Sequence, residues 1–185
     1  MKRSNKLSSN VALLRGLNLG GKNRISMADL SRMFAEAGCT DVQTYIQSGN
    51  VIFQASQSKL EKLPGLIAKS IADRFGYKTP VVLRTAEQLG ETIGNNPFLK
   101  AGADEGTLHV YFLAGVPDAR GIAGLDPARS SPDEFFVRGR DVYVHLPNGM
   151  GRTKLSNAYF DSKLATVSTA RNWRTVLKLF EFMQA

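Results

Sequence analysis

The sequence predicts an α+β protein in which strands and helices follow the order β-α-β-β-α-β twice along the chain. Short apolar runs bounded by glycine and turn residues alternate with segments whose apolar residues recur at helical spacing. In each half, turn residues separate two neighbouring strands, which is typical of an antiparallel hairpin. The 185 residues are 43% hydrophobic, which is enough for a buried core in one domain or in two small modules.

The first module is predicted over residues 11–85, after a disordered or extended tail over residues 1–10. Its strands are expected at Val11–Leu17, Val42–Ile46, Val51–Gln54 and Pro80–Leu83. The first helix is expected to follow Ser26, a capping residue, and to end at Gly38. The second helix carries apolar residues from Leu60 to Phe75, with a late start or a kink at Pro64. This order of elements is the ferredoxin-like arrangement.

The second module is predicted over residues 86–185 and includes a C-terminal helix. Its strands are expected at Thr107–Leu113, Glu134–Val137, Asp141–Leu146 and Leu164–Ser168. Helices are expected at Ala86–Ile93, Pro117–Leu125 and Asn157–Lys163. The C-terminal helix follows from a stripe at i, i+3, i+4 and i+7 that begins at Trp173, which is therefore expected in the core. No linker separates the two modules, so they are expected to pack together.

The charge of the chain favours an anionic partner. Lys and Arg number 24 against 16 acidic residues, a net charge of +8, although a solvated basic surface explains the same excess. The single cysteine, Cys39, excludes a disulfide framework within the chain and argues against a Cys-based zinc site. The sequence contains no apolar segment long enough for a signal peptide or a membrane span, so a soluble, cytoplasmic protein without a membrane partner is expected.

The segment GLNLGGKN, Gly16 to Asn23, matches a phosphate-binding P-loop except that Asn23 replaces the Ser or Thr. A P-loop also needs a helix that starts at the Gly-Lys pair and a parallel sheet behind it. Here the capping residue is Ser26 and the strand order is antiparallel, so we reject the P-loop. Two interpretations are left open. The loop presents amides and the cations Lys22 and Arg24 to an anion, or it is a turn that needs a positive φ at its glycines.

Three segments together resemble the bacterial family known as domain of unknown function 1697. They are ALLRGLNLGGKNRISMADL, TYIQSGNVIF and ARNWRTVLKL, and the resemblance extends from about Val11 to Leu179. The resemblance implies ferredoxin-like modules and no assigned activity. The positions typical of the family are Arg15, Gly16, Asn18, Gly20, Gly21, Tyr45, Gln47, Ser48, Gly49, Asn50, Arg171, Asn172 and Trp173.

Polar residues gather near the strand ends of the first module. If its second strand runs parallel to its first, the loop after the first strand and the following hairpin lie at the same end of the sheet. Arg could then bind phosphate or carboxylate there, while Asn and Gln could read base edges. The alternative is that these residues only stabilise turns. The candidate ligand-binding residues are Arg15, Asn18, Lys22, Asn23, Tyr45, Gln47, Ser48, Asn50, and, at the start of the C-terminal helix, Arg171 and Asn172.

A weaker candidate is an aromatic face on two strands of the second module. His109 and Tyr111, and Tyr143 and His145, alternate along strands expected to be adjacent, where RNA-recognition modules stack bases. An aromatic patch covered by a helix is the alternative. Two histidines without a third ligand make a weak metal site, so neither a metal nor a cofactor is predicted.

We identify no catalytic constellation in the sequence: it offers no defensible Ser-His-Asp order, and no close pair of acids in it suggests general acid-base chemistry. The leading hypothesis is a non-catalytic binder of an anionic partner, with RNA or single-stranded nucleic acid as the first candidate. One alternative is a small enzyme or sensor for a phosphorylated or carboxylated metabolite, held by Arg15, Lys22 and Arg171. Another is a protein-interaction adaptor with an exposed apolar patch. The oligomeric state is not predicted.

Overall fold

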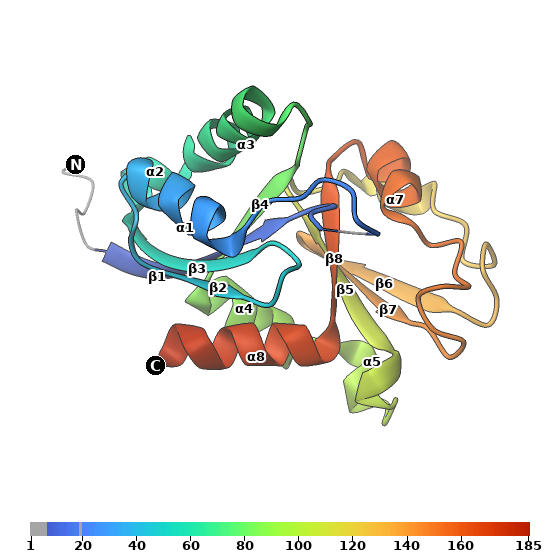
Figure 1. Ribbon diagram of the computed structural model, residues 1–185. Coiled ribbons are helices and arrows are strands. Elements are labelled where there is room, and N and C mark those ends of the chain that lie inside the picture. The colour runs from blue at the N-terminus through green and yellow to red at the C-terminus, as the bar shows by residue number, and fades with distance from the viewer. Residues whose placement is uncertain (1–6, 19) are drawn as a thin grey trace. The chain divides into compact units, whose positions relative to one another are not determined.

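The computed structural model describes residues 7–18 and 20–185, which form two four-stranded antiparallel sheets (Figure 1). The chain divides into two compact units. The first runs to Gly90 and includes Leu179–Ala185, and the second is Glu91–Lys178. Each sheet is built from a β-α-β-β-α-β succession, which confirms the predicted α+β fold of tandem ferredoxin-like modules. Within the described ranges, no helix is both long enough and apolar enough to cross a membrane.

The first sheet has the strand order β2-β3-β1-β4. Its strands are β1 at Leu7–Leu14, β2 at Thr40–Tyr45, β3 at Asn50–Ser56 and β4 at Val81–Thr85. β1 pairs antiparallel with β3 and β4, and β2 pairs antiparallel with β3. β2 therefore runs parallel to β1, as predicted, and the loop after β1 lies at the same end of the sheet as the β2–β3 hairpin.

Strand β1 begins at Leu7 rather than at Val11. Its ladder with β3 continues through a polar stretch, in which Ser9 pairs with Gln54, to the pair of Leu7 with Ser56. The early start was missed because this ladder is made by backbone groups, which pair whether or not the side chains are apolar. Residues 1–6 of the predicted tail lie outside the described residues.

Helices α1 at Met27–Glu36, α2 at Gln57–Leu60 and α3 at Leu63–Phe75 lie on one side of the first sheet (Figure 1). Ser26 caps α1, because its Oγ accepts a hydrogen bond from the Asp29 amide at 3.0 Å. Pro64 lies in the first turn of α3, where its missing N–H group is not needed, so the helix starts there and is not kinked.

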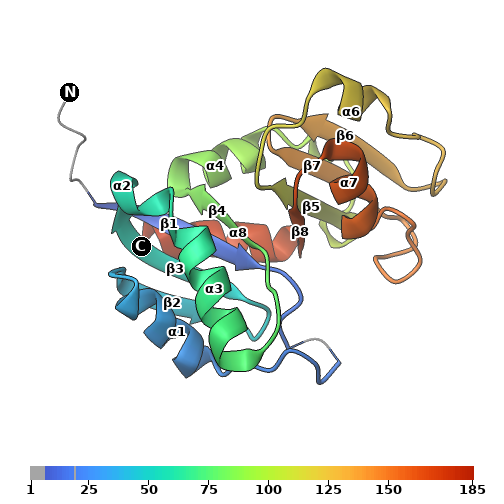
Figure 2. The ribbon, with the colours of Figure 1, turned by 90° about the horizontal axis from the view of Figure 1, so that it is seen from above.

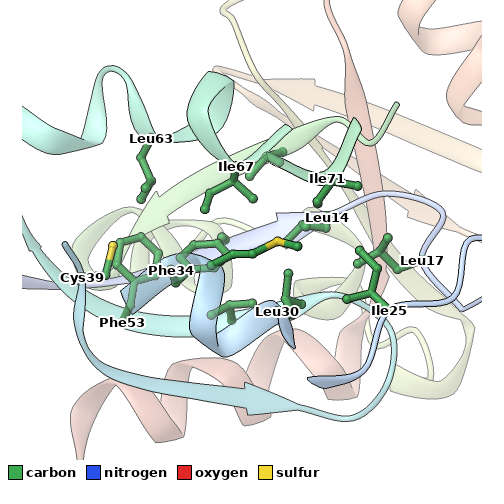
Figure 3. Packing of buried hydrophobic residues seen from close by; sticks show 14 of the residues in the cluster. Leu14, Leu17, Ile25, Leu30, Phe34, Cys39, Phe53, Leu63, Ile67 and Ile71 are labelled. Atoms are coloured by element: carbon green, nitrogen blue, oxygen red, sulfur yellow. The ribbon is translucent and has the colours of Figure 1, made fainter. Parts of the chain in front are cut away.

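The core between these helices and the sheet is closely packed (Figure 3). The rings of Phe34 from α1 and Phe53 from β3 have centroids 5.2 Å apart, and Ile67 of α3 is buried in the same cluster. Cys39 is also buried in it. Burial raises the pKa of the Cys39 thiol, and the nearby Lys59 partly opposes that effect.

The opposite face of the first sheet is covered as well, because Val11 and Leu13 are fully buried there. Two helices supply the covering side chains within this unit. They are α4 at Ala86–Gly94, which belongs to the unit as far as Gly90, and α8 at Trp173–Gln184, which belongs to it from Leu179 onward. Phe180 lies directly against Gly90, whose Cβ, if it had one, would be 3.2 Å from the Phe180 ring.

The second sheet has the strand order β6-β7-β5-β8. Its strands are β5 at Leu108–Leu113, β6 at Glu134–Arg138, β7 at Asp141–His145 and β8 at Ser168–Asn172. The remaining elements are α5 at Pro97–Lys100, a 3₁₀ turn at Glu105–Thr107, α6 at Ala119–Ala123 and α7 at Asn157–Leu164. Figure 2 shows α6 and α7 beside this sheet, and α7 residues such as Phe160 share a core with β5 and β7.

The last strand was predicted at Leu164–Ser168, and this assignment is wrong. Leu164 is the final residue of α7, and Ala165 ends the helix in the left-handed conformation with a φ of 50°. The strand begins at Ser168, which pairs with Leu113 of β5. Of the predicted segment, Leu164 belongs to the buried side of α7, where it is 3% exposed, and Ser168 belongs to the strand.

Candidate functional site

The loop between β1 and α1 is held in place by the side-chain amide of Asn18. Its Nδ2 donates hydrogen bonds to the carbonyl oxygens of Ile25 and Gln47, both at 3.1 Å, and its Oδ1 accepts from the Ile25 amide at 3.0 Å. These bonds join the loop to the β2–β3 hairpin. Both amide protons of Asn18 are thus used within the protein, so Asn18 shapes the site rather than offering its protons to a ligand.

The same loop uses left-handed backbone at several positions. Gly20 and Gly21 have φ values of 55° and 79°, as the turn interpretation expects, and Asn23 has a φ of 51°. The Asn23 Nδ2 donates to the Gly16 carbonyl at 3.1 Å. Helix α1 begins at Met27, so the Gly-Lys pair does not open a helix and the geometry of a P-loop is absent.

A cavity of about 430 Å³ opens beside this loop. It is lined by Asn18, Gly21, Arg24, Ile25, Ser26 and Gln47. The Arg24 guanidinium lies close to Gly21, where an added Cβ would be 3.5 Å from Nη2. None of the described residues in this lining is acidic. The carboxylate of Asp29, in the first turn of α1, accepts a hydrogen bond from Ser26 Oγ at 2.7 Å and lies 3.6 Å from the Arg32 guanidinium.

The N-terminus of α1 meets the same cavity through its capping residue, Ser26. The amide of Asp29 donates to the Ser26 hydroxyl, and the amide of Leu30 donates to the Ser26 carbonyl at 3.0 Å. The amides of Met27 and Ala28 make no hydrogen bond within residues 7–18 and 20–185. Two N–H groups and the positive end of the helix dipole are therefore available at this end of α1, directly after Ser26.

The polar segment QSGN forms the turn of the β2–β3 hairpin, and its side chains hold that turn together. The side chain of Asn50 is fully buried, and its Nδ2 donates to the Tyr45 carbonyl at 3.1 Å and to Ser48 Oγ at 2.8 Å. The Tyr45 ring packs edge-on against Phe182, with centroids 5.4 Å apart. The cavity lining does not include Tyr45, Ser48, Asn50 or Phe182. The exposed Gln47 is the hairpin residue that reaches it.

The remaining cationic candidates lie elsewhere. Arg15 is half-buried, its amide donates to the Pro80 carbonyl at 3.0 Å, and it does not line the cavity. Lys22 is exposed on the loop but is not part of the lining either.

Arg171 and Asn172 belong to β8, in the second unit. Burial lowers the pKa of Arg171 to about 10, and its Nη1 donates to Thr169 Oγ1 at 2.9 Å and to the Ala170 carbonyl at 2.7 Å. Asn172 Oδ1 accepts from the Thr175 amide at 2.8 Å and so caps α8.

The structure also reveals a buried arginine that sequence reasoning did not identify. Arg84 of β4 is 2% exposed, and its Nη1 donates to the carbonyl of the preceding residue at 2.9 Å, as Arg171 does. Arg84 pairs with Val11 of β1, and Arg171 pairs with Val110 of β5. The two arginines therefore occupy equivalent positions in the two modules. No sequence motif indicates this equivalence, because it depends on strand register.

The four aromatic and histidine candidates do not share one face. In the β5–β7 pair Tyr111 is opposite Val142 and Tyr143 is opposite Val110, so the two tyrosines point to opposite sides of the sheet. Both are about 1% exposed. Tyr143 donates its hydroxyl proton to the Thr92 carbonyl at 3.0 Å, and Tyr111 donates to the Leu155 carbonyl.

Burial raises the pKa of Tyr111 to about 12 and lowers the pKa of His109. The ring of His145 lies beside Phe98, with centroids 5.8 Å apart. The two tyrosine rings therefore offer no open surface on which a base could stack. Within the part of the chain that the structure describes, no group of three or more His, Cys, Asp or Glu residues could hold a metal ion.

The site thus differs in composition from the predicted set. It brings together Asn18 and Gln47, as the shared sheet end predicts. The other lining residues, Gly21, Arg24, Ile25 and Ser26, were not among the candidate ligand residues, and Arg24 was considered only as a cation of the loop. The available signal was the segment Arg24-Ile25-Ser26, which places a cation directly before a helix-capping residue. Ser26 was recognised only for its capping role.

The fold and the site define an α+β protein of two ferredoxin-like modules, with a cavity at one loop whose lining includes Arg24. The chain matches the profile of the family described as "Protein of unknown function (DUF1697)" over residues 7–143, and it belongs to that family. The third segment that suggested this family, residues 170–179, lies beyond the matched region.

Among solved structures, the conserved bacterial protein SP0830 from Streptococcus pneumoniae is similar, with a TM-score of 0.73 and 20% sequence identity. The similarity covers 96% of this chain and 99% of that one, and at this identity it shows the fold alone. No curated protein matches the sequence.

Proposed function

We propose that the protein is a non-catalytic binder of an anionic partner, and that this partner is RNA or a single-stranded nucleic acid. The observation that carries the proposal is the cavity of about 430 Å³ between the β1–α1 loop and the β2–β3 hairpin. Its lining combines Arg24 with Ser26, the capping residue of α1, and none of the described residues in it carries a carboxylate.

A phosphate group suits this chemistry. A guanidinium donates several N–H groups in a fixed plane, and helix N-terminal amides add donors and a positive dipole end. The amides of Met27 and Ala28 are uncommitted within the described residues, and Lys22 is exposed on the same loop. The net charge of +8 adds a long-range attraction for a polyanion.

The exposed side chain of Gln47 supports a nucleic-acid ligand in particular. A Gln amide has both a donor and an acceptor, which is the pattern that base edges require, and its main chain is fixed through the bond from Asn18. Both tyrosines of the second sheet are buried, so contacts to phosphates and base edges would replace stacking on an open sheet. Single strands expose these edges, whereas A-form duplexes conceal them in a deep groove.

A second candidate is a sensor for a phosphorylated or carboxylated metabolite. The cavity volume favours it, because small-molecule sites commonly measure about 300–1,000 Å³. In this case Arg24 would act as the anion clamp in place of Arg15 and Arg171. The two candidates differ in how strongly binding responds to salt, since only a polyanion releases many counterions.

The test is a fluorescence anisotropy titration of short labelled RNA and single-stranded DNA at several salt concentrations. We expect Arg24→Ala to weaken binding to every sequence and to reduce the salt slope by about 1. Gln47→Ala should change base preference with little effect on the slope. Arg32→Ala is the matched control, because Arg32 is an exposed arginine of α1 that does not line the cavity.

Absence of binding at low salt, where a charge of +8 helps most, would rule out the nucleic-acid ligand. Calorimetry with phosphorylated and carboxylated small molecules would then test the second candidate. A shallow salt dependence, with binding abolished by Arg24→Ala and retained by Arg32→Ala, would support it. Equal losses for both arginine variants would refute the assignment of the cavity.

A further inference from the structure

Strand β6 forms an outer edge of the second sheet, and among the described strands it pairs with β7 alone. The Leu113 amide donates to the Arg140 carbonyl at 2.8 Å, and the Leu146 amide donates to the Thr107 carbonyl at 2.9 Å. In an antiparallel ladder these bonds alternate, so the even-numbered residues of β7 bond to β5 and the odd-numbered ones bond to β6.

The peptide groups of Phe135 and Val137 consequently point away from β7. Neither residue makes a hydrogen bond on that outer side within the described part of the chain. β6 thus presents two N–H and two C=O groups in the extended conformation that another strand can pair with.

The outer strand of the first sheet, β2, is protected in a way that β6 is not. The β2–β3 register shifts between Thr40 and Gln43, and Asp41 has a positive φ of 48°. A bulge of this kind twists an edge strand away from further pairing. The β6–β7 register runs from Glu134 to Arg138 without any shift, so the β6 edge stays regular.

We propose that β6 pairs antiparallel with β6 of a second copy of this chain across a two-fold axis centred on Phe136. The strand sequence EFFVR is self-complementary in that register. Glu134 of each copy lies opposite Arg138 of the other, and Phe136 lies opposite its own equivalent. Phe135 of each copy then faces Val137 of the other, so all four outward peptide groups of each strand form hydrogen bonds.

The side chains on the exposed face of β6 suit this pairing. Glu134, Phe136 and Arg138 share one face because they alternate along the strand. Phe136 is 45% exposed, and the side chain of Glu134 is 64% exposed even though it lies 3.5 Å from His145 Nδ1. Pairing would bury two aromatic rings against each other and place two opposite-charge pairs directly across the new strand boundary.

The end of the strand also leaves room for a second copy. A cavity of about 480 Å³ lies at the start of β6, lined by Pro127, Ala128, Ser131, Pro132, Asp133 and Glu134. In the proposed register the β6–β7 turn of the other copy, Gly139–Arg140, reaches this cavity. The acidic end of one strand thus receives the basic end of the other. The two-fold pairing occupies the open β6 edge of each of the two copies, so no β6 edge is left for a third copy and the assembly closes as a dimer.

The test is sedimentation analysis of the full chain over a range of concentrations, without nucleic acid, so that its outcome is independent of the proposed function. We expect a dimer. Glu134→Arg and Arg138→Glu each place like charges opposite one another twice, and each should raise the dimer dissociation constant by about tenfold or more.

A mixture of the two single variants provides the decisive measurement. Glu134→Arg has only cations at the two positions and Arg138→Glu has only anions, so their mixture in equal amounts should form a heterodimer as tightly as the parent pairs with itself. Restored association also shows that both variants are folded. The double variant Glu134→Arg, Arg138→Glu should dimerise alone, because it exchanges both charges.

Val116→Lys is the control, since Val116 is 74% exposed in the same unit but lies outside β6. It should dimerise as the parent does, whereas Phe136→Lys should be monomeric. A parent that stays monomeric at the highest concentration would overturn the proposal. So would single charge variants that associate as tightly as the parent, or a mixture that fails to recover the dimer.

Discussion

Gly49 lies in the β2–β3 hairpin two residues after Gln47, and the effect of substituting it can be worked out from the structure. It has a φ of 77° in the β2–β3 hairpin, and a Cβ there would lie 2.9 Å from the Leu14 Cβ and 3.0 Å from the Leu14 carbonyl oxygen. Gly76, at the end of α3 in the same unit, has the same φ of 77° but no atom within 4 Å of the added Cβ. The two glycines thus share the same φ and differ in crowding.

Gly76→Ala should therefore lower the free energy of unfolding by about 1–2 kcal/mol, the usual penalty for a side chain in left-handed backbone. Gly49→Ala carries the same penalty and adds about 1–3 kcal/mol for overpacking, because the Leu14 contact is partly backbone and cannot rotate away. The total is about 2–5 kcal/mol. For a chain of this length it corresponds to a fall in Tm of about 2–4 °C for each kcal/mol.

Urea denaturation followed by circular dichroism measures both variants on the same unit of the protein. The difference between the two glycines is the quantity of interest, because it isolates the steric part of the penalty. Equal destabilisation would refute the reasoning and would mean that the strand carrying Leu14 moves aside freely. Gly49→Ala should also weaken ligand binding, because it displaces Gln47 from the cavity.

Three further predictions concern the core and α8. Trp173→Ala should lower the free energy of unfolding by about 3–5 kcal/mol, since Trp173 is fully buried; denaturation that matches the parent would contradict this. Asn172→Ala should lower it by about 0.5–2 kcal/mol through loss of the α8 cap, and a smaller effect of Asn172→Ser would support the capping role. Burial raises the pKa of Tyr111 to about 12, so the native state keeps a proton that the unfolded state loses from about pH 10 upward. Stability that is fully present below about pH 10 should therefore fall by about 2–3 kcal/mol as the pH rises through 12, and Tyr111→Phe should flatten that fall.

The features predicted well from sequence are those with a local cause. Ser26 caps α1 because a hydroxyl can reach an amide a few residues along the chain, and the QSGN segment turns because Gly49 accepts a positive φ. The stripe at Trp173 predicts a buried helix face, and Trp173 is buried. The last strand was misplaced because a segment as short as Leu164–Ser168 cannot be assigned to a helix or to a strand by the period of its apolar residues.

The candidate site was predicted only in part, because its residues come from separate parts of the sequence and meet only in the folded chain. Asn18 and Gln47 were expected to converge from the strand order, and they do. Whether Arg24 or Arg15 would line the cavity depends on the path of the left-handed loop, which no short pattern encodes. Tyr111 and Tyr143 fall on opposite faces because a one-residue step in register reverses the direction of a side chain.

By itself the sequence determined the order of the elements, the caps and turns that separate them, and the absence of a P-loop, since each follows from contacts within a few residues. Three features were decided by the tertiary structure alone. The Asn18 side-chain amide donates its hydrogen bonds within the protein, and Arg84 and Arg171 occupy equivalent buried positions. Strand β6 retains an open edge. The reason is physical. Hydrogen-bond partners, burial and free edges depend on which distant strands become neighbours, and that choice is made by the packing of the whole core.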